Sequence, residues 1–174
     1  MIYMVEHGFN ESEPKSEAEW NEWYTEHATF SFRKVPGWHT GQRFRALPPS
    51  RPKYRAMYSL DNAAVFDTPE YKSTTGGKFP ETWRALITDF HRNFADGGDM
   101  PAVAKNECLI VVTPPATGNE LTGVKLDWRN IVGLEKSLPR IGLGVVDRAT
   151  GEAIAKRALP GVNAYEPVFD RWKI

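Results

Sequence analysis

The fold is indicated first by residues 16–34, which read SEAEWNEWYTEHATFSFRK. Apolar and aromatic side chains recur there at i, i+3 and i+4, the spacing of one helix face. That face carries Trp20, Trp23, Tyr24, His27 and Phe30. Ser16 and Glu19 form a capping-box pattern at the start, and Pro36-Gly37 is expected to end the helix near Lys34. We therefore predict a helix that buries an aromatic face containing one histidine.

Strands are predicted on both sides of this helix. Residues 1–7 are apolar at nearly every position, as in a strand buried on both faces, and residues 38–46 and 54–60 follow as two further strands. The expected order continues with short helical turns at 61–66 and from 67, a break at 74–77, a helix at 80–90 and a strand at 91–95. This order of strands and helices over about 95 residues predicts a ferredoxin-like sandwich of the α+β class.

The remaining residues begin a similar order again. We expect a strand at 107–113, a helix at 127–138, strands at 141–146 and 152–158 around a turn at 147–151, and a last strand within 165–172. This order predicts a degenerate second ferredoxin-like repeat in residues 99–174, and a structural extension is the alternative. The domain boundary is placed after residue 98, in the loop 99–106.

Residue types are distributed unevenly along the 174 residues. Of the 21 aromatic residues, 17 lie in residues 1–98, and so do all four histidines. Residues 6–26 hold seven Glu, whereas residues 27–60 hold seven Lys and Arg and no acidic residue. The 22 basic and 22 acidic residues of the chain cancel, which argues against a nucleic-acid partner because phosphate binding needs an excess of cations. A ligand site is therefore expected in the first part.

Compartment is inferred from three simpler features. The only cysteine, Cys108, lies in the apolar run Cys108-Leu-Ile-Val-Val112 and is expected to be a buried structural thiol. The first residues lack the basic region of a signal peptide, and no apolar run is long enough for a membrane span. We expect a cytoplasmic protein with no membrane partner.

Several motifs of residues 1–95 occur in an order that resembles a known family. They are Trp20-Asn-Glu-Trp-Tyr24 with His27, Val35-Pro-Gly37, Arg43 with Arg45, Tyr54-Arg-Ala-Met-Tyr58 and Thr68-Pro-Glu-Tyr71. In this order they resemble the EthD-like branch of the dimeric α+β barrel superfamily. The resemblance implies a ferredoxin-like fold in which two sheets face each other in a barrel, built from a homodimer or from tandem repeats. It also implies a cavity between sheet and helices, with a histidine at the position of His27.

Two histidines are candidate catalytic residues. His27 lies in the apolar stripe of the first helix, so it should face the sheet. His39 has the same strand parity as Arg43 and Arg45, so these three side chains should project to one sheet face. An imidazole can act as base or acid near neutral pH. The alternative for both residues is a structural histidine of the core.

The candidate substrate-binding residues are Trp23, Tyr24, Arg43, Tyr58, His7 and His91. Arg43 and Tyr58 would stabilise negative charge that develops on an oxygen atom. The aromatic residues would line a cavity for an aromatic or hydrophobic small molecule, although an aromatic core is the alternative. Neither an HExxH nor a CxxC motif occurs, so no metal and no cofactor are expected.

The function predicted from these observations is that of a small cofactor-independent enzyme. It would be a lyase or isomerase that acts by proton transfer on an aromatic or enolisable small molecule, and a cofactor-free monooxygenase is a variant. Two alternatives come from other classes, a haem-binding α+β barrel protein and a non-catalytic small-molecule-binding protein.

Overall fold

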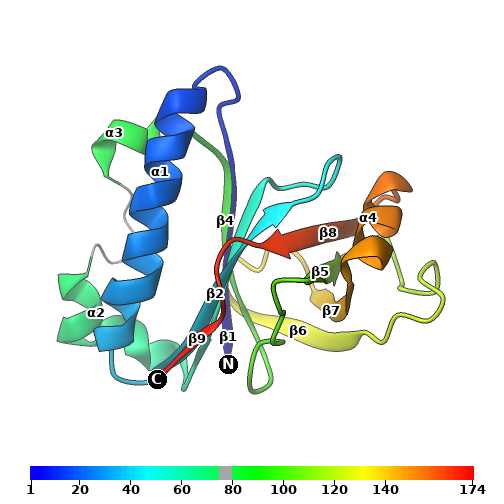
Figure 1. The fold of residues 1–174 in the computed structure, drawn as a ribbon. Coiled ribbons are helices and arrows are strands. Elements are labelled where there is room, and N and C mark those ends of the chain that lie inside the picture. Colours follow the sequence, from blue (N-terminus) through cyan, green and yellow to red (C-terminus); the bar gives the residue numbers. More distant parts are fainter. Residues whose placement is uncertain (75–79) are drawn as a thin grey trace.

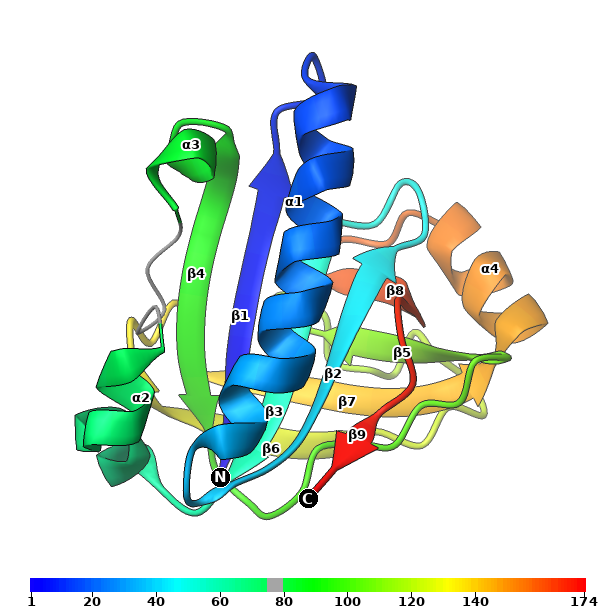
Figure 2. The ribbon, with the colours of Figure 1, turned by 60° about the vertical axis from the view of Figure 1, so that its left-hand side comes forward.

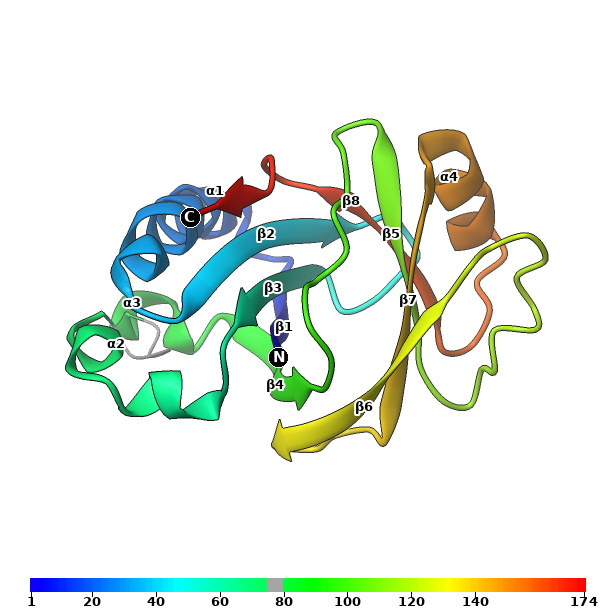
Figure 3. The same ribbon diagram turned by 90° about the horizontal axis from the view of Figure 1, so that it is seen from below.

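The computed structural model describes residues 1–74 and 80–174, and eight antiparallel strands close a barrel within these residues. The strands are β1 (Ile2–Phe9), β2 (Trp38–Ala46), β3 (Tyr54–Leu60), β4 (Ile87–Ala95), β5 (Glu107–Val112), β6 (Asp127–Leu134), β7 (Arg140–Asp147) and β8 (Val162–Pro167). Their order is β3-β1-β4-β6-β7-β5-β8-β2, and β2 pairs with β3 to complete the ring (Figure 3). A short strand, β9 (Trp172–Lys173), adds to β2.

The two halves of the chain use the same strand order. It is β2-β3-β1-β4 in the first half and β6-β7-β5-β8 in the second. Their helices differ, because α1 (Pro14–Glu26) connects β1 to β2 whereas α4 (Arg148–Lys156) connects β7 to β8. Both helices lie outside the ring of strands (Figures 1 and 3). The fold is thus a mixed α/β barrel with few helices.

The predicted elements of residues 1–74 are largely confirmed. The strands at 38–46 and 54–60 have the predicted bounds, and β1 begins one residue later and ends two residues later than expected. The helix begins at Pro14, and its N-cap Glu13 makes no side-chain hydrogen bond, so the capping box of Ser16 and Glu19 was wrong. Proline suits the first helical turn because its missing N–H would have no partner there.

The C-terminal end of this helix has a distinct geometry. The chain continues as a π-helical turn, η1 (His27–Ser31), and a 3₁₀ turn, η2 (Phe32–Lys34). Helical backbone therefore ends at Lys34, as predicted. Figure 2 shows α1 lying across the outer face of β1, β3 and β2, which its aromatic side chains cover.

Short helices take the place of a second long one before β4. They are η3 (Ala63–Asp67), α2 (Pro69–Ser73) and α3 (Glu81–Arg84). The first two confirm the turns expected at 61–66 and from 67, and the break expected at 74–77 falls mostly outside the described residues. The helix predicted at 80–90 was wrong beyond Arg84, because Ile87 already pairs with Phe9 of β1. The two-helix layer of a ferredoxin-like sandwich is therefore not confirmed.

Two predictions for the second part were wrong. Residues 127–134 form the strand β6 rather than a helix, since they pair with β4 and β7 and join the two halves of the barrel. Residues 148–156 form helix α4 rather than a turn and a strand. Asp147 caps this helix by accepting a hydrogen bond from the amide of Thr150 at 2.9 Å.

Side chains alternate between the barrel interior and its outer faces. Ile2 and Met4 point inward to an apolar core with Leu109 and Val111, whereas Tyr3 points outward to α1. The outer face of β5 and β8 carries a third cluster, covered by α4. Among the helices of the described chain, none combines the length and apolar character that crossing a bilayer requires.

Candidate functional site

The most unusual group on the α1-covered face is the guanidinium of Arg43. The side chain is fully buried, and it lies between the rings of Tyr24 and Tyr54, each centred 4.4 Å from Cζ. None of its three nitrogens donates a hydrogen bond to a described residue. Burial lowers the pKa of Arg43, and the nearby tyrosines and Glu17 oppose that shift. The face therefore contains a charged donor group whose hydrogen-bonding capacity is unused.

His7, a predicted substrate-binding residue, lies beside this guanidinium in the interior of the molecule. Its ring is buried between Trp20 at 5.5 Å and Tyr54 at 5.3 Å, measured between ring centroids. Burial, together with the charge of Arg43, lowers the pKa of His7 to about 3. Nδ1 lies 2.9 Å from the carbonyl oxygen of Gly8, which can only accept, so Nδ1 carries the proton of the neutral ring. His7 is therefore a neutral imidazole at pH 7.

A hydrogen-bond network fixes the Tyr54 ring over Arg43. The Tyr54 hydroxyl donates to Glu17 Oε1 at 2.8 Å and accepts from Asn21 Nδ2 at 2.9 Å. Lys53 binds the same Glu17 carboxylate at 2.8 Å. These contacts join the acidic helix to the basic hairpin that follows β2, so part of the charge asymmetry in the sequence is structural.

Tyr58, a predicted substrate-binding residue, lies on the same face, together with Tyr54 and Leu60. Burial raises the pKa of Tyr58 well above 10, and neighbouring Tyr24 raises it further. The phenol is therefore neutral and able to donate a hydrogen bond. Four predicted residues, His7, Tyr24, Arg43 and Tyr58, belong to one buried cluster.

His27 and Trp23 lie together where α1 passes into the π-helical turn. Their rings stack with centroids 4.8 Å apart and an interplanar angle of 8°, and Phe32 contacts the His27 ring in a T-shaped arrangement. Both side chains are half-buried, and burial lowers the pKa of His27 to about 4. Phe32 also contacts Tyr58, at 5.2 Å, so this histidine adjoins the buried cluster through one aromatic ring.

The placement predicted for His39 was wrong. A bulge between Trp38 and Thr40 shifts the register of β2 against β3, so Trp38 takes the place on the α1 face and His39 leaves it. The His39 side chain is 50% exposed, and its Nε2 lies 2.7 Å from Asp61 Oδ1. The expected alignment of His39 with Arg43 is thus broken by one inserted residue.

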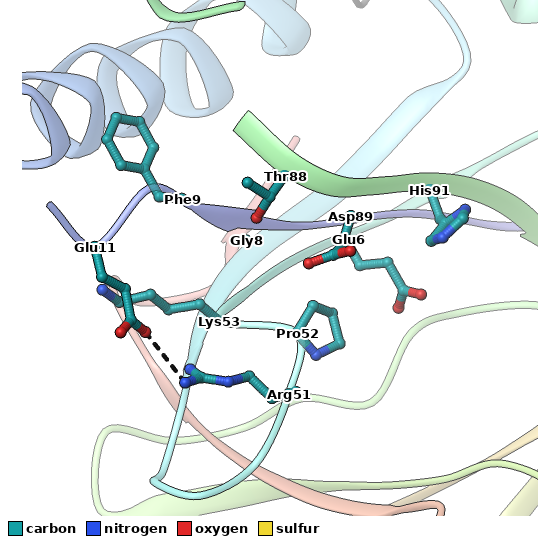
Figure 4. A pocket seen from close by; sticks show the side chains of 10 residues that line it. All are labelled: Glu6, Gly8, Phe9, Glu11, Arg51, Pro52, Lys53, Thr88, Asp89 and His91. Carbon is teal, nitrogen blue, oxygen red and sulfur yellow. Dashed lines mark hydrogen bonds and ion pairs between the residues drawn. The ribbon is translucent and has the colours of Figure 1, made fainter. Parts of the chain in front are cut away.

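His91 belongs to a different cavity, of about 590 Å³, at one mouth of the barrel (Figure 4). It lies within β4, which begins four residues earlier than the predicted strand, and its Nδ1 is 2.9 Å from Glu135 Oε2. Glu6, on the wall of this cavity, forms an ion pair with buried Arg55. Glu6 and His91 face the interior of the barrel. The buried cluster of His7, Tyr24, Arg43 and Tyr58, hereafter the Arg43 cluster, lies on the outer face of the sheet, so the sheet separates His91 from it.

Metal-ligating groups do not gather anywhere in the described residues, since no set of three or more His, Cys, Asp and Glu side chains converges there. Cys108 is buried as predicted, and burial raises the pKa of its thiol to about 11.

Tyr54, Glu17 and Asn21 were missed as site residues by the sequence analysis. Strand parity with Tyr58 was a usable signal for Tyr54. For Glu17 and Asn21 the one usable signal was helical spacing. Glu17 lies one turn before Trp20 and Asn21 one turn before Tyr24, on the helix face expected to meet the sheet.

Comparison with known proteins extends only to the fold. No protein-family model and no curated protein matches the sequence. The structure is similar to a crystal structure described as that of an anthrone oxidase-like protein, with a TM-score of 0.57 and 11% sequence identity. The similarity covers 99% of this chain and 92% of that one. At this identity the likeness shows an α+β barrel fold along the whole chain.

Proposed function

We propose that this protein is a small cofactor-independent enzyme that transfers a proton on an aromatic or enolisable small molecule. The substrate would lie between α1 and the outer face of β1, β3 and β2. One observation carries the proposal: a fully buried guanidinium, Arg43, with three nitrogens that bind no described residue.

The energetics of burial support a ligand at Arg43. Burying a charge without a hydrogen-bonded partner costs several kcal/mol, and each of the two flanking tyrosine rings offsets about 2 kcal/mol of it. An enolate or phenolate oxygen supplies the missing acceptor. Negative charge that develops during deprotonation is then stabilised by donors already in place.

Neutral imidazoles supply the base in this proposal. His27 adjoins the cluster at its half-buried edge, and His7 lies within it. Both have lowered pKa values, so both rings are neutral near pH 7 and each has one nitrogen lone pair. We assign proton transfer to His27, with His7 as the assisting histidine in place of His39. Tyr58 donates to the substrate oxygen beside Arg43.

The description of the structural neighbour favours a particular substrate type and the oxygen-consuming variant of this activity. An anthrone is an aromatic ketone whose methylene group is acidic because loss of its proton gives an aromatic enolate. The site of this protein offers a cation, a phenol and neutral imidazoles for that reaction. Oxidation of the enolate by dioxygen would follow without a bound cofactor.

Hydrogen–deuterium exchange separates proton transfer from oxidation. Anthrone is incubated anaerobically in D₂O with the protein, and loss of the methylene proton signal is followed by NMR. We expect exchange faster than in buffer, slowed in His27→Gln and Arg43→Met but not in Arg51→Gln, a matched exposed arginine. Full activity in both His27→Gln and His27→Ala would exclude this assignment. Oxygen uptake after admission of air tests the oxidase variant.

The alternatives give other signatures in the same samples. A Soret band in the purified protein, or on haem titration, would favour the haem-binding protein. A co-purifying ligand that is never converted would favour a binding protein.

The identical strand order of the two halves supports two structural proposals about the domains. Residues 1–98 would be an EthD-like ferredoxin-like domain, and residues 99–174 a degenerate second repeat. Because one chain closes the barrel, a homodimer would form by another surface. Native mass spectrometry tests the homodimer, and cell fractionation tests the proposed cytoplasmic location.

A further inference from the structure

A second cavity, of about 390 Å³, lies where the two halves of the chain meet on the outside of the barrel. It lies at the end of β8, a strand that passes between α1 and α4 (Figure 1). Its walls come from α1, β2, β3, the loop before β5, the start of α4 and the end of β8. The lining residues are Asn21, Arg45, Tyr54, Lys105, Arg148, Glu166, Pro167 and Val168.

Two arginines in this cavity are held by one carboxylate. Glu166, whose side chain is 15% exposed, accepts from Arg45 Nε at 3.0 Å and Nη2 at 2.6 Å, and from Arg148 Nη2 at 2.8 Å. Arg148 Nε also binds Glu152 at 2.9 Å. Burial raises the pKa of Glu166, but the hydrogen bonds from both arginines outweigh burial and lower it. The carboxylate is therefore ionised and orders both guanidinium groups.

Positive charge exceeds negative charge around this cavity. Lys105 forms no hydrogen bond or ion pair with any residue of the described ranges, so three cations face the two carboxylates of Glu166 and Glu152. Arg148 is the first residue of α4, an end where the helix dipole disfavours a cation. Its placement there strengthens a local positive potential in a chain whose net charge is zero.

The opposite wall of the cavity is suited to an aromatic ring with a hydroxyl group. Pro167, Val168 and the Tyr54 ring provide apolar surface. Asn21 Oδ1 is buried and accepts no hydrogen bond from a described residue, although Asn21 Nδ2 donates to Tyr54. A hydroxyl hydrogen would satisfy this carbonyl oxygen.

We propose that this cavity binds a small aromatic hydroxy acid, with its carboxylate on Arg148 and Lys105 and its hydroxyl directed to Asn21. The site is separate from the Arg43 cluster, because Tyr54 forms the wall between them. The proposal concerns binding and does not rest on the proposed catalytic activity.

Isothermal titration calorimetry with 4-hydroxybenzoate at low salt tests the site. We expect one site per chain, with affinity reduced about 10-fold or more in Lys105→Gln and in Arg148→Gln, because each loses a charge-assisted hydrogen bond. Lys156→Gln, at the other end of α4, is the matched control and should bind as the unchanged protein does. Arg43→Met should also retain binding.

Two further ligands, the neutral 4-hydroxybenzamide and inorganic phosphate, test whether binding requires both the carboxylate and the aromatic ring. The neutral 4-hydroxybenzamide should bind at least 10-fold more weakly, because it cannot pair with the cations. Equal binding of the amide, equal binding of inorganic phosphate, or undiminished affinity in the Lys105 and Arg148 variants would each overturn the proposal. Loss of binding in Arg43→Met alone would show that the ligand binds at the Arg43 cluster, and it would also overturn the proposal.

Discussion

The outer faces of the two halves of the barrel have the same strand order and contain different chemistry. The face under α1 holds a buried arginine, a neutral histidine and several tyrosines among its aromatic residues. The face under α4 holds aliphatic residues such as Ile110, Val112 and Ile154, and buried Cys108 lies among them. Its thiol is kept protonated by burial.

This contrast shows that barrel closure and site formation are separable. Backbone pairing between strands in the order β2-β3-β1-β4 and β6-β7-β5-β8 closes the ring, and it does not depend on which side chains point outward. The outward residues, and the helix that covers them, decide whether a half holds reactive groups. A long helix with aromatic residues leaves space to enclose an arginine, whereas the short α4 packs small residues tightly against the strands.

The largest expected effect comes from Arg43→Met, which removes the buried charge and keeps most of the side-chain volume. We expect anthrone exchange to slow about 10³-fold, because one preorganised donor to developing negative charge contributes that much. The midpoint of urea unfolding should stay the same or rise, since the lost cation has no hydrogen-bond acceptor among the described residues.

Arg55→Met is the matched control for a buried arginine that has a partner. It leaves the Glu6 carboxylate uncompensated and should destabilise the protein by about 3–5 kcal/mol. Equal destabilisation by the two substitutions would show that Arg43 is structural, and the contrast between the faces would then lose its functional meaning.

The face under α4 should respond to substitution in stability alone. Ile110 is fully buried there, and Ile110→Ala should lower the free energy of unfolding by about 3 kcal/mol through lost burial and a residual cavity. The exchange rate per folded molecule should not change. Reduced activity at a temperature where the variant is fully folded would show that the second half contributes to the site.

Acid should destabilise the first half, which holds all four histidines. The pKa values of His7 and His27 are lowered in the folded state, to about 3 and about 4, so the unfolded chain binds more protons below pH 6.5. Stability is thus fully present above pH 6.5 and falls as pH drops toward 4, by about 1.4 kcal/mol per pH unit for each histidine.

Urea unfolding at pH 7.5 and pH 5 measures this dependence, and His7→Gln should reduce its slope. Amide exchange should accelerate first in β1 and β3, which pack around His7. A slope unaffected by His7→Gln would mean that His7 is not a buried neutral imidazole.

The smallest effect is expected at the charged surface of the hairpin. Glu11 and Arg51 form an ion pair 3.1 Å long with both side chains largely exposed. Glu11→Gln should change the free energy of unfolding by less than about 0.5 kcal/mol and leave activity unaltered, because exposed pairs are screened by water. A larger change in the free energy of unfolding or in activity would show that residues at the barrel mouth contribute to the site.

The sequence by itself determined the elements whose signals lie within a short window. Period-2 patterns fixed the strands at 38–46 and 54–60, and Pro36-Gly37 fixed the end of the first helix, because these effects act between near neighbours. It also named His7, Tyr24, Arg43 and Tyr58 as candidate binding residues, although strand parity alone did not decide which sheet face meets the helix.

Only the tertiary structure decided the features that depend on distant partners. Residues 127–134 form a strand because β4 and β7 offer open backbone groups on both sides, a condition that no local pattern records. His39 lies outside the site because one bulge of β2 against β3 turns its side chain away from the α1 face. The register of a strand is set by its partner strand. Arg43 became buried, with no hydrogen-bond acceptor among the described residues, because α1 closes over it. The burial of a side chain and the pairing of a strand depend on residues that are distant in the sequence, so a local sequence pattern does not reveal them.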